Sequence, residues 1–217
     1  MTEPLHHCMY LTAYDTAAQN LFDRPRTGFL LRAAVLTELA IRGHLTEVEG
    51  AAAVAAAGST GDSVLDKALG DVGAHRRSWK AWLRYDRKET LEAVEHQLAA
   101  LGVLTIEEKE KSSFGRGSKR QLTVTDPVAV KALQDGASAI LHARDPADRL
   151  APADAALLAL AAAGGIPAVL SRKDSRDHKD RIEALTDRLG DIAPGLDKAV
   201  HSLRITMIAA QGGMGGS

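Results

Sequence analysis

Residues 28–43 read GFLLRAAVLTELAIRG, a run whose apolar positions fit an α-helix. Its bulky apolar side chains recur one turn apart and share one face: Leu31, Val35 and Leu39. Glu38 and Arg42 stand four positions apart, a spacing at which a favourable ion pair forms on a helix surface. Gly43 is typical of the residue after a helix. The run therefore predicts a helix from Gly28 to Arg42.

The composition is that of an ordinary globular protein of mainly α class. The 217 residues are 45% apolar and 25% charged, a balance far from that of disordered chains. Aromatic residues make up only 4%, and the apolar share is mostly Ala and Leu, which helices tolerate better than sheets do. At this length we expect one compact domain over residues 5–210, followed by a flexible Gly-rich tail at residues 211–217.

Charge and cysteine content limit the possible partners and compartment. A formal net charge of -1 creates no overall field towards nucleic acid or an anionic membrane, so an anion site must be local. A single cysteine, Cys8, forms no internal disulfide, which is typical of a reducing compartment. The first ten residues lack a signal-peptide pattern, and residues 155–170 are too short and too interrupted to span a bilayer. We expect a cytoplasmic protein that meets a membrane only peripherally.

Two aspartates are placed to begin helices. Asp62 precedes a helix that is expected to reach Gly70. Asp86 and Glu89 match a capping box, in which the cap residue and the third helical residue bond to each other's backbone. The helix after this box is expected to run to Leu101.

The second half of the chain predicts one β-hairpin and several helices. Residues 103–125 hold two strand-like runs around a polar, Gly-containing turn at residues 111–118, which is expected to be exposed. Later helices are expected at residues 127–142, 152–163 and 196–210. The second of these lacks polar side chains over much of its length, so it is expected to be central. Residues 5–21 fit a strand or a helix start equally well.

Motifs for catalysis and metal binding are missing from the sequence. The eight histidines form no HExxH pattern, and one cysteine cannot supply a thiolate zinc site. Neither a nucleophile elbow nor a phosphate loop ending in Gly-Lys-Ser/Thr occurs. We therefore expect no enzyme activity, no cofactor and no metal site.

Arg32 is the first candidate binding residue, because it interrupts an otherwise apolar helical turn. An unpaired guanidinium is costly to bury, so this side chain must contact a carboxylate, a carbonyl or an external anion. A structural ion pair and a ligand-binding role both fit.

The most basic window of the chain surrounds its two tryptophans, Trp79 and Trp82. Its cations include Arg84, Arg87 and Lys88. This composition suits a membrane interface, where indoles lie at the level of the headgroups and cations bind phosphate. Burial of one or both indoles in the core fits as well.

The expected hairpin turn holds a second basic group around Phe114, including Arg116. It suits membrane contact or self-association through the hairpin. It also fits a solvated tip with no partner.

Three blocks of sequence resemble the Golgi phosphoprotein 3 family. In residues 30–45, Arg32 stands six residues before a Glu-Leu-Ala-x-Arg-Gly-x-Leu signature. The second block reads TGDSVLDKAL at residues 60–69, and the third reads LAALGVL at residues 98–104 and leads into the expected hairpin. The likeness extends over about residues 11–189. Three separated blocks in the correct order are improbable by chance.

The resemblance implies a compact helical domain around a central four-helix bundle with one projecting β-hairpin. It also implies a peripheral membrane adaptor that binds phosphatidylinositol 4-phosphate on a basic face and tethers client protein tails. Self-association or membrane contact through the hairpin is implied too.

The headgroup site implied by the resemblance is only partly kept. Arg32 falls on the family's phosphate-contacting arginine and Lys88 on a second family cation. The family's tryptophan falls on Asp23, with Phe22 beside it, and a further cation falls on Leu91. The expected lipid-headgroup residues are Arg32, Lys88, Arg84 and Arg87. Another anionic lipid is equally compatible with them.

Two other functions remain open at this level. One is a protein-protein scaffold without lipid affinity. The other is a winged-helix nucleic-acid binder, since a helix at residues 89–101 is followed by Gly-Val-Leu and a hairpin with a basic tip. The near-neutral net charge counts against the second, because nucleic-acid affinity depends on a basic footprint. No nucleic-acid partner is expected.

Overall fold

The computed structural model describes residues 3–109, 119–143, 145–192 and 194–203. Over these residues the chain is mainly helical with three small antiparallel strand pairs, so the expected α class is confirmed. The helices are α1 (Leu5–Thr12), α2 (Arg24–Ile41), α3 (Ser63–Ala74), α4 (Trp79–Arg84), α5 (Arg87–Ala100), α6 (Pro127–His142), α7 (Pro152–Gly164), α8 (Asp174–Asp177) and α9 (Lys179–Ile192), with a 3-10 turn η1 (Ala147–Arg149). The strand pairs are β1 (Tyr14–Asp15) with β2 (Asn20–Leu21), β3 (Leu45–Val48) with β4 (Ala51–Val54), and β5 (Leu104–Lys109) with β6 (Lys119–Val124).

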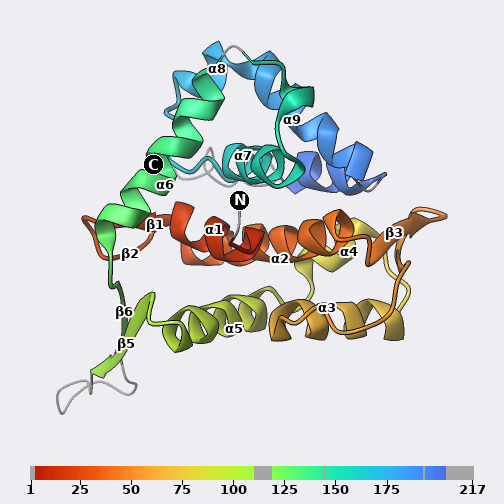
Figure 1. The fold of residues 1–217 in the computed structure, drawn as a ribbon, viewed down its shortest axis with the longest axis horizontal. Coiled ribbons are helices and arrows are strands. Elements are labelled where there is room, and N and C mark those ends of the chain that lie inside the picture. The colour runs from red at the N-terminus through yellow and green to blue at the C-terminus, as the bar shows by residue number, and fades with distance from the viewer. Residues whose placement is uncertain (1–2, 110–118, 144, 193, 204–217) are drawn as a thin grey trace, which may run out of the picture.

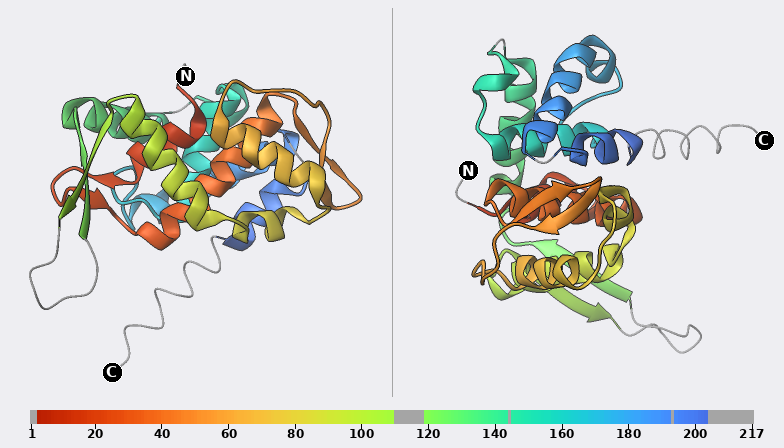
Figure 2. Two further views of the ribbon diagram at one scale, coloured as in Figure 1. Left: turned by 90° about the horizontal axis from the view of Figure 1, so that it is seen from below. Right: turned by 90° about the vertical axis from the view of Figure 1, so that its right-hand side faces the viewer.

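Helix α2 lies at the centre of the fold. Figure 1 shows α1 and α2 between two tiers of helices, with α6, α7, α8 and α9 on one side and α3 and α5 on the other. The right-hand view of Figure 2 shows the same layering from the side. Helix α2 contacts α1, α3, α5 and α7. The expected central four-helix bundle is not confirmed, because α2 is covered from both sides and is buried nearly all round.

The ends of α2 follow from its sequence. The Asp23 carboxylate accepts a hydrogen bond of 2.9 Å from the Arg26 N–H, and Pro25 occupies the first turn, where its missing N–H is not needed. The helix therefore begins one turn before the expected Gly28. The predicted pair near its other end is present, with the Arg42 Nε 2.7 Å from a Glu38 oxygen.

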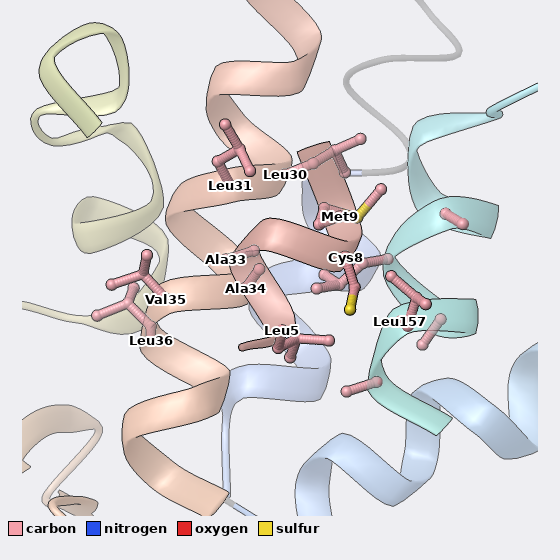
Figure 3. Packing of buried hydrophobic residues seen from close by; sticks show 14 of the residues in the cluster. Leu5, Cys8, Met9, Leu30, Leu31, Ala33, Ala34, Val35, Leu36 and Leu157 are labelled. Carbon is pink, nitrogen blue, oxygen red and sulfur yellow. The ribbon is translucent and has the colours of Figure 1, made fainter. Parts of the chain in front are cut away.

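Helix α7 is buried along almost its whole length, as expected for its apolar sequence. It packs against α1, α2 and α9. Figure 3 shows Leu157 of α7 facing Cys8 and Met9 of α1, with Leu30 of α2 nearby. The buried apolar side chains form one cluster that includes residues from α1 through residue 203.

Several local expectations need correction. Asp86 does not form a capping box: its backbone is left-handed, with φ of 52°, and its side chain pairs with Lys67 instead of a helix N–H. Residues 45–54 form a second hairpin that the sequence analysis missed, because the Ala-rich β4 carries no strand signal. For residues 5–21, where the sequence left strand and helix open, the structure has α1 and then the β1–β2 pair.

The predicted hairpin at residues 103–125 is confirmed as β5 and β6, and it projects from the helices in Figure 1. Its turn, with Phe114 and Arg116, lies outside the described residues, as do residues 204–217. Residues 196–203 are helical, as expected. Among the described residues, no helix has both the length and the apolarity needed to cross a membrane.

Candidate functional site

A pocket of about 500 Å³ lies where the starts of α2 and α5 meet α4 and the last described residues; we call it the α2–α4–α5 pocket. Four of its lining side chains are basic and one is acidic. The lining residues that matter for binding are Asp23, Arg26, Phe29, Lys80, Leu83, Arg84 and Arg87. Phe29 and Leu83 give it an apolar wall beside the cations.

The short helix α4 carries part of this pocket on one face. Lys80, Leu83 and Arg84 line the pocket, and their spacing of three and four residues places them side by side. Trp79 and Trp82 lie on another face and are 2% and 0% exposed. Burial of these indoles therefore fixes α4 so that Lys80 and Arg84 face the pocket.

A close contact between α2 and α5 positions Arg87. A Cβ added at Gly28 would lie 3.0 Å from the Arg87 carbonyl oxygen, so only glycine permits this approach without a shift. One residue further along α2, the Phe29 ring lies under the Arg87 guanidinium, 4.2 Å from the ring centroid. This cation-π contact holds the cation at the pocket wall.

The cations of the pocket differ in how far they are neutralised. Arg26 lies 3.5 Å from an Asp23 oxygen and donates to the Gly164 carbonyl at 3.0 Å. Lys80, Arg84 and Arg87 have no carboxylate within ion-pair distance in the described part of the chain. Their charge is available to an external anion, because the one acidic residue of the described lining, Asp23, is paired with Arg26.

Arg32 occupies a different environment and does not line this pocket. It is 2% exposed, and its Nε donates to the Trp82 carbonyl at 3.3 Å. Its guanidinium lies 5.6 Å from the Trp82 ring and 5.7 Å from the Tyr85 ring. Burial lowers the pKa of Arg32, while Asp71 and Asp86 favour its charged form. The side chain thus ties α2 to the segment that carries Arg84 and Arg87.

The whole-chain comparison identifies the family. A family model described as Golgi phosphoprotein 3 (GPP34) matches residues 5–203. The chain belongs to the Golgi phosphoprotein 3 family. Its membership is consistent with a Golgi-associated lipid or protein adaptor. No curated protein matches the chain.

Of the residues expected to bind a headgroup in this Golgi phosphoprotein 3 member, the structure brings Arg84 and Arg87 together and leaves two elsewhere. Arg32 is buried beneath α4. Lys88 is exposed, lies outside the pocket lining, and has its Nζ 3.9 Å from a Glu92 oxygen.

Trp79 and Trp82, whose sequence fits both a membrane interface and the core, belong to the core. The Trp79 Nε1 donates to a Glu47 oxygen at 3.0 Å and to the Pro194 carbonyl at 3.2 Å, so its polar atom is satisfied inside the protein. Neither Trp79 nor Trp82 is available to a bilayer in this conformation.

Sequence reasoning missed two pocket cations, Arg26 and Lys80. A signal for Lys80 was present, since it stands four residues before Arg84 in the basic window. Arg26 carried no such signal, because its place in the pocket depends on how the first turn of α2 packs against α4.

Proposed function

We propose that this chain is a non-enzymatic, peripheral membrane adaptor that binds an anionic lipid headgroup in the α2–α4–α5 pocket. The observation that carries the proposal is the meeting of Lys80, Arg84 and Arg87 beside Phe29 with no described carboxylate partner. A phosphorylated headgroup would supply the missing negative charge through short, charge-assisted hydrogen bonds.

Phosphatidylinositol 4-phosphate is the first lipid to test, because the chain belongs to the Golgi phosphoprotein 3 family. The proposed pocket uses Arg84 and Arg87 directly and Arg32 as a buried support. A cytoplasmic location at a membrane surface, tethering of client protein tails and self-association through the β5–β6 hairpin complete the proposal. Phe22, which is 41% exposed and adjacent to Asp23, is suited to contact the lipid surface.

The test is flotation of the full-length chain with phosphatidylcholine vesicles. One set carries phosphatidylinositol 4-phosphate, one carries phosphatidylserine at matched charge, and one carries neither. The variants are Arg84→Glu and Arg87→Glu, with Lys88→Glu as the control, since it makes the same charge change next to Arg87 but outside the pocket.

A pocket site predicts that Arg84→Glu and Arg87→Glu each weaken binding to phosphoinositide vesicles strongly while Lys88→Glu changes it little. A basic residue near an anionic surface contributes about 1 kcal/mol, so a reversal is expected to reduce affinity by about tenfold or more. Equal losses in all three variants would indicate diffuse surface charge. Absence of binding to every vesicle would favour the protein-protein scaffold.

A further inference from the structure

A second polar cluster lies within the fold, away from the α2–α4–α5 pocket residues. It joins His6 and His7 of α1, Asp62 at the start of α3 and Gln97 of α5. His6 and His7 are 0% and 5% exposed, whereas Asp62 and Gln97 are half-buried. We call this group the His6–His7–Asp62 cluster.

Three contacts in this cluster have the length that separates neighbouring ligands of a tetrahedral metal ion. The His6 Nε2 lies 3.3 Å from the Asp62 Oδ2 and 3.3 Å from the Gln97 Oε1. The His7 Nε2 lies 3.1 Å from the same Gln97 oxygen. His6, His7 and Asp62 each offer one ligand atom, and these three atoms lie within 4.8 Å of one another. Bonds of about 2.0–2.1 Å to a tetrahedral zinc ion place neighbouring ligand atoms about 3.3 Å apart.

The surrounding hydrogen bonds hold the Asp62 carboxylate and the Gln97 amide in fixed orientations. The Asp62 Oδ1 is used by the backbone, since it accepts from the N–H groups of Val64 and Leu65 at 2.9 and 3.0 Å. It also accepts from the Gln97 Nε2 at 3.0 Å, which turns the amide oxygen of Gln97 towards the two imidazoles. The Asp62 Oδ2 is left for the cluster. Such outer contacts commonly orient metal ligands.

Both imidazoles direct their Nε2 at one Gln97 oxygen, so the two nitrogens that would bind the ion lie against the same acceptor. The buried Nδ1 atoms of His6 and His7 have no hydrogen-bond partner among the described residues. These Nδ1 atoms are not the nitrogens that face Asp62 and Gln97, and an ion bound at Nε2 would leave them unchanged.

We propose that His6, His7 and Asp62 bind one divalent transition-metal ion of the zinc type, with the Gln97 oxygen or a water completing four-coordination. Imidazole and carboxylate ligands suit such ions. The site is structural in kind: it would fasten α1 to the start of α3 and, with Gln97 as the fourth ligand, to the last turn of α5.

A second group of possible ligands, His142, Asp174 and His178, serves as the internal comparison. The His142 side chain is 42% exposed and its Nδ1 is already 2.7 Å from the Ser138 carbonyl. It lacks the buried, unpartnered nitrogens of the first cluster in the described structure. It supplies the control variant.

The experiment uses the full-length chain after treatment with a chelator. Zn²⁺ is titrated by calorimetry, Co²⁺ is titrated by absorption spectroscopy, and thermal unfolding is followed with and without Zn²⁺. The variants are Asp62→Asn and His7→Gln, with His142→Gln as the control. Asparagine is as good an N-cap as aspartate, so Asp62→Asn keeps the start of α3 while removing the charged ligand.

The proposal expects one Zn²⁺ per chain, a four-coordinate Co²⁺ spectrum and a melting temperature that rises with Zn²⁺ concentration. Outer contacts of metal sites change affinity by about 10–100-fold, so loss of a direct ligand in Asp62→Asn or His7→Gln is expected to weaken binding by at least about 100-fold. His142→Gln is expected to bind like the unaltered chain.

Three results would overturn the proposal. One is no binding of Zn²⁺ or Co²⁺ at a large excess of metal, which would make the cluster a hydrogen-bond network only. Another is unchanged binding in a folded Asp62→Asn protein. The third is loss of binding in His142→Gln alone, which would place the ion at the exposed group.

Discussion

Arg32 lies on one face of α4, and the pair Arg84 and Arg87 lies on another. Their surroundings give these arginines different roles. On the buried face, Arg32 packs on Trp82 and Tyr85 and is bonded to a backbone carbonyl. On the pocket face, Arg84 and Arg87 are exposed and have no described carboxylate partner. Burial closes Arg32 to a ligand even though its Nη2 lies 4.0 Å from an Asp71 oxygen and has no hydrogen-bond partner among the described residues. Exposure at a pocket, and not the absence of partners alone, makes a guanidinium available to an external anion.

The largest effect is expected from removing Arg32, which tests whether this arginine is structural. Arg32→Ala deletes a fully packed side chain between α2 and α4, so we expect a loss of about 2–4 kcal/mol in the free energy of unfolding, in the range of other large-to-small core changes. Arg32→Met keeps an unbranched chain against the two rings without the buried charge and is expected to lose less. Urea unfolding measures the free energy of unfolding of both variants, provided that its dependence on urea concentration is unchanged. If Arg32→Ala kept full stability but lost vesicle binding, Arg32 would belong to the ligand site.

The pocket arginines are expected to behave in the opposite way. Because Arg84 and Arg87 are exposed, Arg84→Ala and Arg87→Ala should change the free energy of unfolding by less than about 0.5 kcal/mol. Each should weaken binding to anionic vesicles by about 1–2 kcal/mol, with a loss that diminishes at higher salt. Flotation at two salt concentrations checks the loss of vesicle binding, and urea unfolding of the same samples checks the free energy of unfolding. A large stability loss with unchanged binding would reverse the assignment of the two faces.

The difference between the two sets explains how far the sequence could predict the site. Helical periodicity predicted α2, α6 and α7 because their apolar faces are decided by local spacing. The basic window around Arg84 and Arg87 was visible for the same reason. Arg32 could not be placed from sequence alone, since an arginine in an apolar helix fits a buried contact and a ligand contact equally. Its position is decided by Trp82, which is 50 residues away in sequence.

The capping-box error at Asp86 has a similar cause. The pattern of Asp86 and Glu89 satisfies the local rule, but Lys67 of α3 pairs with the Asp86 carboxylate and the backbone turns left-handed. A long-range ion pair therefore replaced a local cap. The His6–His7–Asp62 cluster was missed for a related reason, because its side chains, with Gln97, come from α1, the start of α3 and α5 and follow no motif spacing.

Gly28 offers a finer test of the pocket face. In Gly28→Ala, the new Cβ would lie 3.0 Å from the Arg87 carbonyl oxygen, so the start of α5 must move by a few tenths of an ångström. Alanine gains about 1 kcal/mol of helix propensity, which partly offsets the strain, and a net change in stability within about 1 kcal/mol is expected. Vesicle binding should fall measurably because Arg87 moves. A Gly136→Ala control in α6, where an added Cβ meets nothing within 4 Å, should leave binding unchanged.

The smallest effect concerns Lys67, whose carboxylate partners Asp71 and Asp86 also lie near the buried Arg32. Burial alone would lower the pKa of Lys67, but hydrogen bonds to Asp86 and Asp71 outweigh it and raise the pKa above 10.5. A raised folded-state pKa stabilises the fold fully below the unfolded-state value of 10.5, and this contribution is lost as the pH rises through the folded-state value. Since the Lys67 side chain is 55% exposed, Lys67→Met should cost no more than about 1 kcal/mol at neutral pH. The difference in the free energy of unfolding between the unaltered chain and Lys67→Met should stay constant up to about pH 10 and shrink above it.

The same two carboxylates favour the charged form of Arg32, so Lys67 and Arg32 should be coupled. Without Lys67, Asp71 and Asp86 are left to Arg32 alone. The loss of stability in the double variant Lys67→Met/Arg32→Met should therefore differ from the sum of the two single losses. Independent sites agree with their sum within about 0.3–0.5 kcal/mol, and the difference here should be larger. Lys173→Met, which breaks the exposed pair with Asp177 in α8, should combine additively with Arg32→Met. Additivity in both cycles would mean that Asp71 and Asp86 act on Lys67 alone, and that Arg32 is held by the Trp82 carbonyl and the two rings.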